Sequence, residues 1–283
     1  NNGWALFLYT SRGKNHGFSL YRSARGRPDW HVERQSVMET KVFTPAALID
    51  AKADLVALYG EEDGEALYEQ EYFCSFEAAV VGSYYGRILA RLERDKRITS
   101  VPYDPSLPVY TGWDLGIDDA TAVWFAQIAG REVRIIDYAE FRGRGLVEIA
   151  KDIVAKPYLY QEHYLPHDVG TREMTSAKTR KETLESVGLK PIRAGSQLPV
   201  QDGINAVRNM LPKCVFDEAK CAIGLNALRE YRIEFDAKNK TPRKTPLHNW
   251  ASHPADAFRE LAVQRWDYKQ TEALLRNRVA HAE

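Results

Sequence analysis

Residues 109–127, VYTGWDLGIDDATAVWFAQ, carry the clearest structural signal in the chain. Two runs of apolar and aromatic residues flank a turn rich in Gly and Asp, which is the pattern of a β-hairpin. In the first strand, period-two alternation places Gly112, Asp114 and Gly116 on one face. We therefore expect the Asp114 carboxylate to lie where glycines leave room for a bulky, charged group to approach the backbone. The alternative interpretation is that Asp114 only starts the turn.

Composition and charge indicate which class of protein this sequence belongs to. The 283 residues are 44% hydrophobic and 28% charged, which is typical of a globular protein. Lys plus Arg and Asp plus Glu number 39 each, so net charge gives no overall signal for nucleic acid or membrane, and only local clusters are informative. No apolar run of about 18 residues and no signal peptide is found. The chain lacks an initiator Met, and we expect it to be a fragment of a longer protein.

Upstream of the hairpin the sequence predicts one strand and three helices. Residues 4–10 are typical of a buried strand. A Thr-Pro pair opens a helix at 44–60, and further helices are expected at about 63–73 and 84–97. The three prolines within residues 101–108 indicate a domain boundary.

Downstream of the hairpin, strands alternate with helices. We expect strands at 132–140, at a segment ending at 168 and at 191–194, and helices at 145–155, 181–187, 202–210 and 218–231. A hairpin followed by such alternation predicts an α/β fold, with a mixed sheet and helices on both faces.

Two further carboxylates stand at the ends of predicted elements. Asp168 lies in HYLPHDVG at the end of a strand, and Asp256 lies in HNWASHPADAFRELAV, where Pro254 marks the first turn of a helix. Taken singly, Asp168 has an alternative interpretation as a turn residue. Asp256 likewise has one as a first-turn acid that complements the helix dipole.

Three motifs together resemble a known family. GWDLGIDDATAV, LPHDVG and HPADAFR, in that order, resemble the nuclease domain of the large terminase subunit of tailed bacteriophages, which has a ribonuclease H-like fold. Upstream, WALFLYTSRGKNHGF resembles the end of the terminase ATPase domain, and YEQEYFCSFEAAVVG the stretch after it. The resemblance covers about residues 1 to 265. It implies a ribonuclease H-like mixed sheet flanked by helices at 101–268, after a remnant of the ATPase domain at 1–43 and a helical connector at 44–100. A polar tail is expected at 269–283.

The resemblance also implies a catalytic site. Asp114 matches the first-strand catalytic Asp, Asp168 the second acidic ligand and Asp256 the Asp of the C-terminal helix. His253 matches a His near the metal site of many relatives, where it would orient water or a phosphate, or protonate the leaving group. Its alternative is a helix-start His bonded to the backbone.

Three converging carboxylates suit two Mg²⁺ or Mn²⁺ ions, which prefer oxygen ligands. In a two-metal site one ion activates the attacking water and the other stabilises the leaving oxygen. We assign Asp114 as the bridging ligand. Either Asp118 or Asp119 would be an auxiliary acidic ligand, and the sequence does not decide between them.

Basic residues in three loops would rim the catalytic cleft and contact DNA phosphates without reading sequence. They are Arg142, Arg144, Arg172, Lys178, Arg180, Lys181, Lys238, Lys240, Arg243 and Lys244. The alternative for each cluster is an ordinary solvated loop.

The function implied is a metal-dependent DNA endonuclease that cuts concatemeric viral DNA during packaging. Its implied partners are double-stranded DNA, the small terminase subunit and the portal protein, in the host cytoplasm and transiently at the procapsid portal. No GxxxxGK[ST] phosphate-binding loop occurs, so we expect no ATPase activity. Two alternatives stay open: another ribonuclease H-like nuclease, of the resolvase or transposase type, and a non-catalytic module that grips DNA or docks on the portal.

Overall fold

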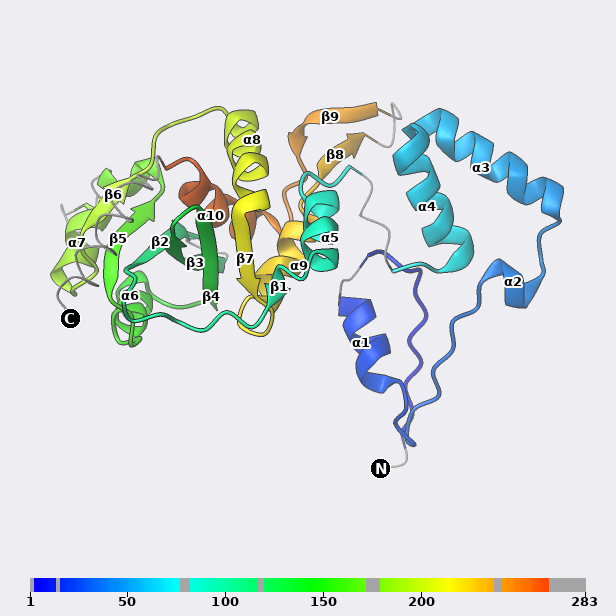
Figure 1. Ribbon diagram of the computed structural model, residues 1–283, viewed down its shortest axis with the longest axis horizontal. Coiled ribbons are helices and arrows are strands. Elements are labelled where there is room, and N and C mark those ends of the chain that lie inside the picture. The colour runs from blue at the N-terminus through cyan, green and yellow to red at the C-terminus, as the bar shows by residue number, and fades with distance from the viewer. Residues whose placement is uncertain are drawn as a thin grey trace.

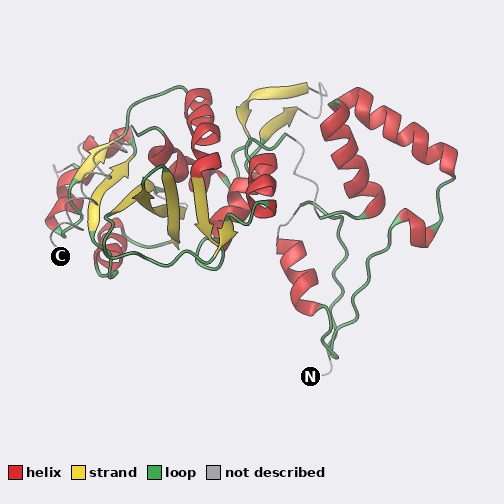
Figure 2. Cartoon of the chain, viewed as in Figure 1, coloured by secondary structure: helices red, strands yellow, loops and turns green. Residues whose placement is uncertain are grey.

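The computed structural model describes residues 3–13, 16–76, 82–116, 120–171, 179–236 and 241–264. A seven-stranded sheet in the order β1-β7-β4-β3-β2-β5-β6 lies in the left half of the view in Figures 1 and 2. The strands of this sheet are β1 Ile98–Thr99, β2 Val109–Asp114, β3 Ala120–Ala129, β4 Glu132–Arg142, β5 Tyr160–Leu165, β6 Ile192–Ala194 and β7 Cys214–Asp217. A second, two-stranded sheet pairs β8 Ile233–Asp236 with β9 Thr241–Pro246.

The predicted hairpin is the middle of the large sheet. Strands β2 and β3 are antiparallel, with Asp114 opposite Ala122, and β4 continues the meander antiparallel to β3. Strands β5 and β6 then add parallel to β2 on its other side. The predicted mixed sheet is therefore confirmed, and the carboxyl ends of β2, β5 and β6 lie along the same edge.

Helices cover both faces of this sheet. In the described residues the helices are α1 His16–Ala24, α2 Val37–Thr40, α3 Pro45–Tyr59, α4 Glu61–Phe73, α5 Gly86–Arg94, α6 Leu146–Val154, α7 Arg180–Ser186, α8 Val200–Met210, α9 Ala222–Glu230 and α10 Ser252–Ala262, with short 3-10 turns η1 His167–Gly170 and η2 Leu211–Lys213. Residues of α5, α8, α9 and α10 share one hydrophobic core with the sheet, and residues of α6 and α7 share the other.

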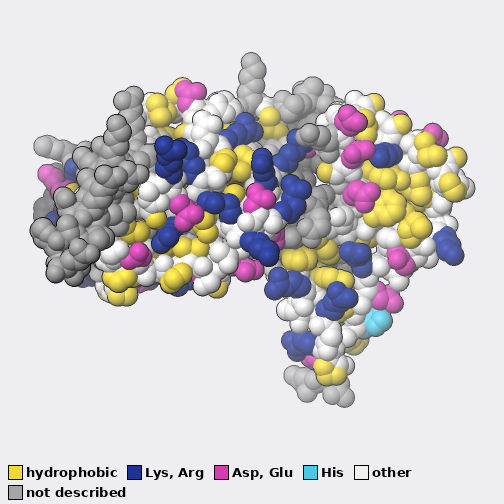
Figure 3. All heavy atoms as spheres, viewed as in Figure 1, with side chains coloured by type: hydrophobic (Ala, Val, Ile, Leu, Met, Phe, Trp, Pro, Cys, Tyr) yellow, Lys and Arg dark blue, Asp and Glu magenta, His cyan; other side chains and the backbone are white. Residues whose placement is uncertain are grey.

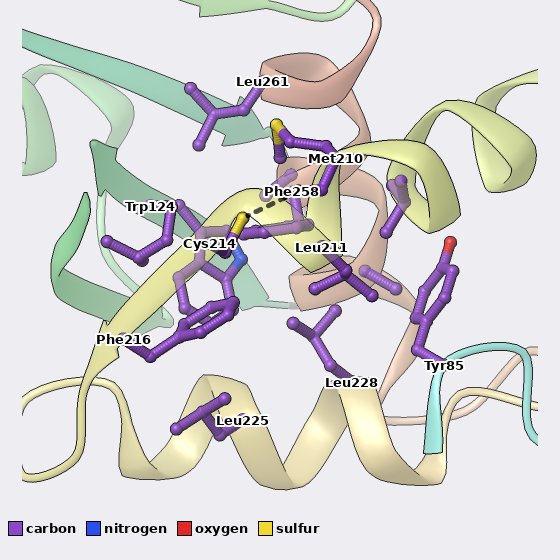
Figure 4. Packing of buried hydrophobic residues seen from close by; sticks show 14 of the residues in the cluster. Tyr85, Trp124, Met210, Leu211, Cys214, Phe216, Leu225, Leu228, Phe258 and Leu261 are labelled. Carbon is purple, nitrogen blue, oxygen red and sulfur yellow. Dashed lines mark hydrogen bonds between the residues drawn. The ribbon is translucent and has the colours of Figure 1, made fainter. Parts of the chain in front are cut away.

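Strand β3 separates the two cores. Trp124 faces the first core, where its ring packs edge-on against Phe258 of α10 at 5.1 Å between centroids (Figure 4). Val123 and Phe125 face the second core, among the apolar residues of α6. Because both faces of β3 are buried, its sequence is apolar throughout rather than alternating.

Several predicted elements differ from the structure. Residues 4–10 form no strand, and Trp4 and Leu8 are exposed. An isolated strand is not stable without a neighbouring strand, and no strand of the described residues pairs with this segment. Arg243 and Lys244, which the sequence analysis placed in a basic loop, lie in strand β9, which pairs with β8. The strand expected to end at Asp168 ends at Leu165, and η1 follows. The helix predicted at 202–210 begins at Val200, so Asp202 lies in its first turn.

Helix α5 and strand β1 pack with the large sheet, although the sequence placed them in the helical connector. Leu89 and Leu92 of α5 are fully or almost fully buried in the first core, and Ile98 of β1 pairs with Phe216 of β7. The sequence-based domain division stays a prediction.

Helices α3 and α4 pack against each other away from the large sheet (Figure 1). No residue of α3 is buried, and Ile49 and Leu58 are 69% and 59% exposed. Apolar side chains accordingly gather over these helices on the surface drawn in Figure 3. Among the described helices, none combines the length and apolarity that crossing a membrane requires.

Candidate active site

The site depends on close contact between α10 and β2. A Cβ at Gly112 would lie 2.5 Å from the Ala257 carbonyl oxygen and 2.6 Å from Leu261 Cγ. Only a glycine therefore lets the helix backbone lie directly on the strand. The sequence predicted open room for a charged group on this face of β2. At Gly112 that room is filled by α10 itself, which brings the first turns of the helix to the carboxyl end of β2.

Asp114 meets His253 at this contact. His253 Nδ1 lies 2.7 Å from Asp114 Oδ2, a hydrogen bond between residues 139 apart in the sequence. Both side chains are largely enclosed, at 20% and 17% exposed. The first turn of α10 is fixed beside them, because Trp124 Nε1 donates a buried hydrogen bond of 2.8 Å to the Pro254 carbonyl oxygen. The fold thus holds the imidazole ring against the carboxylate.

Asp256 follows His253 by three residues on α10, about one turn further along the helix. Its Oδ1 atom is enclosed and has no hydrogen bond, although Arg259 Nη1 lies 3.2 Å away. Burial raises the pKa of Asp256 to about 6. The positive charge of Arg259 opposes this rise, and the negative charge of Asp114 adds to it, which indicates that the two aspartates are near each other.

Asp168 occupies a more open position. It lies in η1, just after β5, and its side chain is 51% exposed. Its Oδ2 accepts a long hydrogen bond of 3.4 Å from Nη1 of Arg180, the first residue of α7. The second predicted acidic ligand is therefore paired with a predicted DNA-contacting cation.

Glu260 is a fourth carboxylate, which the sequence analysis missed. It follows Asp256 by four residues on α10, so the two side chains lie on one face of the helix. The pKa of Glu260 is raised to about 7, chiefly by burial. The positive charge of Arg259 opposes this rise, and the charges of Asp114, Asp256 and Asp168 add to it. The Glu260 carboxyl group thus interacts electrostatically with all three predicted ligands. The signal available in the sequence was this four-residue spacing in PADAFRE.

The predicted DNA-contacting cations that the structure describes all have carboxylate neighbours. The pairs are Arg142 with Glu140, Arg144 with Asp152, Arg180 with Asp168, Lys181 with Glu185 and Arg243 with Glu234. Asp118, Asp119, Arg172, Lys178, Lys238 and Lys240 lie outside the described residues, as does the side chain of Lys244. Elsewhere, Lys and Arg side chains gather around α5 and α8 (Figure 3), where the sequence analysis singled out no cluster.

The carboxylates of the site have the properties that a divalent cation requires. Among the side chains that the structure describes, no three or more from His, Cys, Asp and Glu already surround one point as metal ligands. The enclosed Asp256 Oδ1 and Glu260 Oε2 have no hydrogen-bond partner, however, and the negative charge of Asp114 contributes to the raised pKa values of Asp256 and Glu260. A divalent cation satisfies both conditions, because it prefers carboxylate oxygens and offsets their repulsion. The residues around the β2–α10 contact therefore fit such an ion.

Comparisons with known proteins give structural likeness only. No protein-family model matches the sequence, and no curated protein matches it significantly. The large terminase of a thermophilic bacteriophage is similar over 89% of this chain and 60% of its own, with 12% identity and a TM-score of 0.49. This chain thus spans about 60% of that protein.

Two nuclease domains of large terminases are also similar. For that of bacteriophage P22, the match covers 57% of this chain and 83% of that one, with 15% identity and a TM-score of 0.44. The other is that of bacteriophage SPP1, determined with bound Mn. Its match covers 54% of this chain and 84% of that one, with 16% identity and a TM-score of 0.41. These similar structures are thus one large terminase and two nuclease domains of large terminases.

Proposed function

We propose that this chain is the nuclease part of a phage DNA-packaging terminase, a metal-dependent endonuclease that cuts concatemeric viral DNA. The observation that carries the proposal is the meeting of Asp114, His253 and Asp256 where α10 crosses the end of β2. Residues so distant in the sequence converge on one edge of a sheet, and that edge also holds Asp168. A group of carboxylates with an adjacent imidazole is the residue set that metal-assisted phosphodiester hydrolysis needs.

The carboxylates have separate tasks in this proposal. Asp114, at the end of a rigid strand, and Asp256, on the helix packed against it, would hold the ions between them. Asp168 would complete the ligand set after turning from Arg180, and Arg180 would contact a DNA phosphate. When bound, two divalent cations would supply activation of the attacking water and stabilisation of the leaving oxygen.

His253 is positioned for proton transfer. Its Nδ1 lies against Asp114, so the carboxylate fixes the orientation of the ring. The other ring nitrogen, Nε2, is then the atom that would donate a proton to the leaving oxygen, or orient a water or phosphate.

The substrate in this proposal is double-stranded DNA, held through phosphate contacts. Arg142, Arg144, Arg180, Lys181 and Arg243 would exchange their carboxylate neighbours for phosphates. Such binding is independent of sequence and weakens steeply as salt increases. The small terminase subunit and the portal protein are the proposed partners in packaging.

Cleavage of supercoiled plasmid tests the proposal. We expect nicking and linearisation with Mn²⁺ or Mg²⁺, none with EDTA, and loss of cutting in Asp114→Ala and Asp256→Ala. The matched control is Glu132→Gln, which neutralises a carboxylate paired with Arg134 at the opposite end of the sheet and should cut like the wild type. Cutting in EDTA, or undiminished cutting by Asp114→Ala, would contradict the proposal.

A second candidate function is a non-catalytic module that grips DNA. The Asp168–Arg180 pair favours it, because it engages a predicted metal ligand with a cation. The Asp168→Asn variant separates the two functions. Lost cutting with retained DNA binding supports the nuclease, whereas a wild type that binds DNA but cuts with neither metal supports the module.

A further inference from the structure

Glu260 carries an enclosed oxygen for which the fold supplies no partner. Its Oε2 atom makes no hydrogen bond, although it belongs to a side chain on the helix that builds the site. Leaving a buried polar group unsatisfied costs free energy, and the cost is greater for a charged group. Such a group in a well-packed region points to a ligand that occupies the position when bound.

The surrounding chain is shaped around this carboxylate. Gly195 directly follows β6, and a Cβ there would overlap Glu260 Oε2. The Gly195 N–H donates a 2.7 Å hydrogen bond to the carbonyl oxygen of Leu165, the last residue of β5. Glu260 therefore lies over the carboxyl ends of β5 and β6. Strand β2, which ends in Asp114, is the next neighbour in the sheet.

Glu140, another carboxylate of this region, has protein partners for its oxygens. Glu140 lies in the same row of the sheet as Asp114, since both pair with Ala122. It accepts a 2.8 Å hydrogen bond from the Tyr138 hydroxyl and pairs with Arg142 at 2.9 Å. Glu140 needs no ligand, whereas Glu260 Oε2 has none of these partners.

We propose that Glu260 is a fourth carboxylate ligand of the divalent cations at this site, acting with Asp114 and Asp256. This inference rests on the proposed function and deepens it. The four-residue spacing places Glu260 beside Asp256 on α10, and the glycine at 195 leaves the space its carboxylate occupies. Because Asp168 is exposed and paired with Arg180, Glu260 supplies the enclosed oxygen on the β5 side of the site.

Mn²⁺ binding to the full chain tests this ligand. We would follow the electron paramagnetic resonance signal of free Mn²⁺ during titration of the wild type, Glu260→Gln, Gly195→Ala and the control Glu132→Gln. We expect Glu260→Gln to weaken Mn²⁺ binding at least about tenfold. Gly195→Ala should weaken it in the same direction without changing any charge, because the added methyl displaces the carboxylate. Glu132→Gln should bind as the wild type does.

If Glu260 had only a structural role, its variants would differ from the wild type in melting temperature rather than in Mn²⁺ affinity. Melting in EDTA checks that each variant is folded, and Glu260→Gln should melt no lower than the wild type because it removes an unpartnered charge. Equal Mn²⁺ affinity in the wild type, Glu260→Gln and Gly195→Ala would overturn the role of Glu260 and leave the proposed nuclease standing. A wild type that binds no Mn²⁺ overturns both. Weakened binding in the two variants, with no plasmid cutting by the wild type, supports the ligand and overturns the nuclease.

Discussion

His163 is a buried titratable residue on β5, next to the strand that ends in Asp114. Its Nδ1 lies 2.6 Å from Thr111 Oγ1, which also accepts a 2.7 Å hydrogen bond from Trp113 Nε1. Only 1% of His163 is exposed, and burial lowers its pKa to about 4. The ring is therefore neutral at pH 7, and the fold disfavours its protonation.

This pKa predicts a loss of stability in acid. The folded pKa lies below the unfolded value of about 6.5, so the stabilising contribution is present above pH 6.5 and is lost as pH falls toward 4. At about 1.4 kcal/mol per pH unit, the loss approaches roughly 3 kcal/mol. Urea unfolding of the wild type and His163→Gln from pH 4 to 7.5 measures it. The stability difference between the two proteins should move against the wild type in acid, and a difference independent of pH would refute the prediction.

At the site, the sequence predicted residues that lie at the ends of elements. A strand period and a helix start fix the positions of Asp114 and Asp256 locally, and the family resemblance is what singled them out as ligands. The Asp114–His253 hydrogen bond joins residues 139 apart, and nothing local indicates it. Glu260 was missed because its burial depends on Gly195, which follows a different strand. Pairing of elements, rather than pattern within one, decides these contacts.

At the level of elements, the close packing of α10 on β2 positions the site. Replacing Gly112 with Ala puts a methyl group against backbone atoms of α10, which have no freedom to move aside. We expect about 1–3 kcal/mol of destabilisation and a displaced His253, with reduced metal binding. Gly145→Ala is the matched control, since a Cβ there meets nothing within 4 Å and its φ of −67° suits alanine. Equal melting and metal binding in both variants would show that this contact does not set the site.

Elements with a strong internal period were predicted best. The hairpin of β2 and β3 and the helices α6 and α9 are present, with ends shifted by a few residues. Strand β9 was missed because TPRKTP contains no apolar alternation, and it becomes a strand only by pairing with β8. Strand order was also beyond local reasoning, since β7 inserts between β1 and β4.

At the scale of the whole molecule, the packing of α5 predicts that this helix belongs to the same cooperative folding unit as the large sheet. Tyr85, Leu89 and Leu92 are buried in the first core, so a chain beginning at residue 101 leaves their partners exposed. We predict that a fragment of residues 82–264 melts cooperatively, and that a fragment of residues 101–264 loses several kcal/mol or does not fold. Calorimetry of both fragments beside the full chain measures this. Equal melting of the two would place the start of the unit at residue 101.

The segments before α5 differ from the large sheet in how much apolar surface they expose. Residues 3–13 and helix α3 expose large apolar side chains, such as Trp4 at 87%, while the large sheet buries its own on both faces. Net charge is zero over the whole chain, so any attraction to DNA must come from local clusters rather than from the protein as a whole.

Anomalous scattering from a crystal soaked in Mn²⁺ shows whether the carboxylates at the β2–α10 contact bind divalent cations. We predict an anomalous peak within about 2.0–2.3 Å of carboxylate oxygens of both Asp114 and Asp256. The same soak of Asp114→Ala should lose this peak. Mn²⁺ peaks confined to other surfaces of the wild type, with none between β2 and α10, would contradict the account.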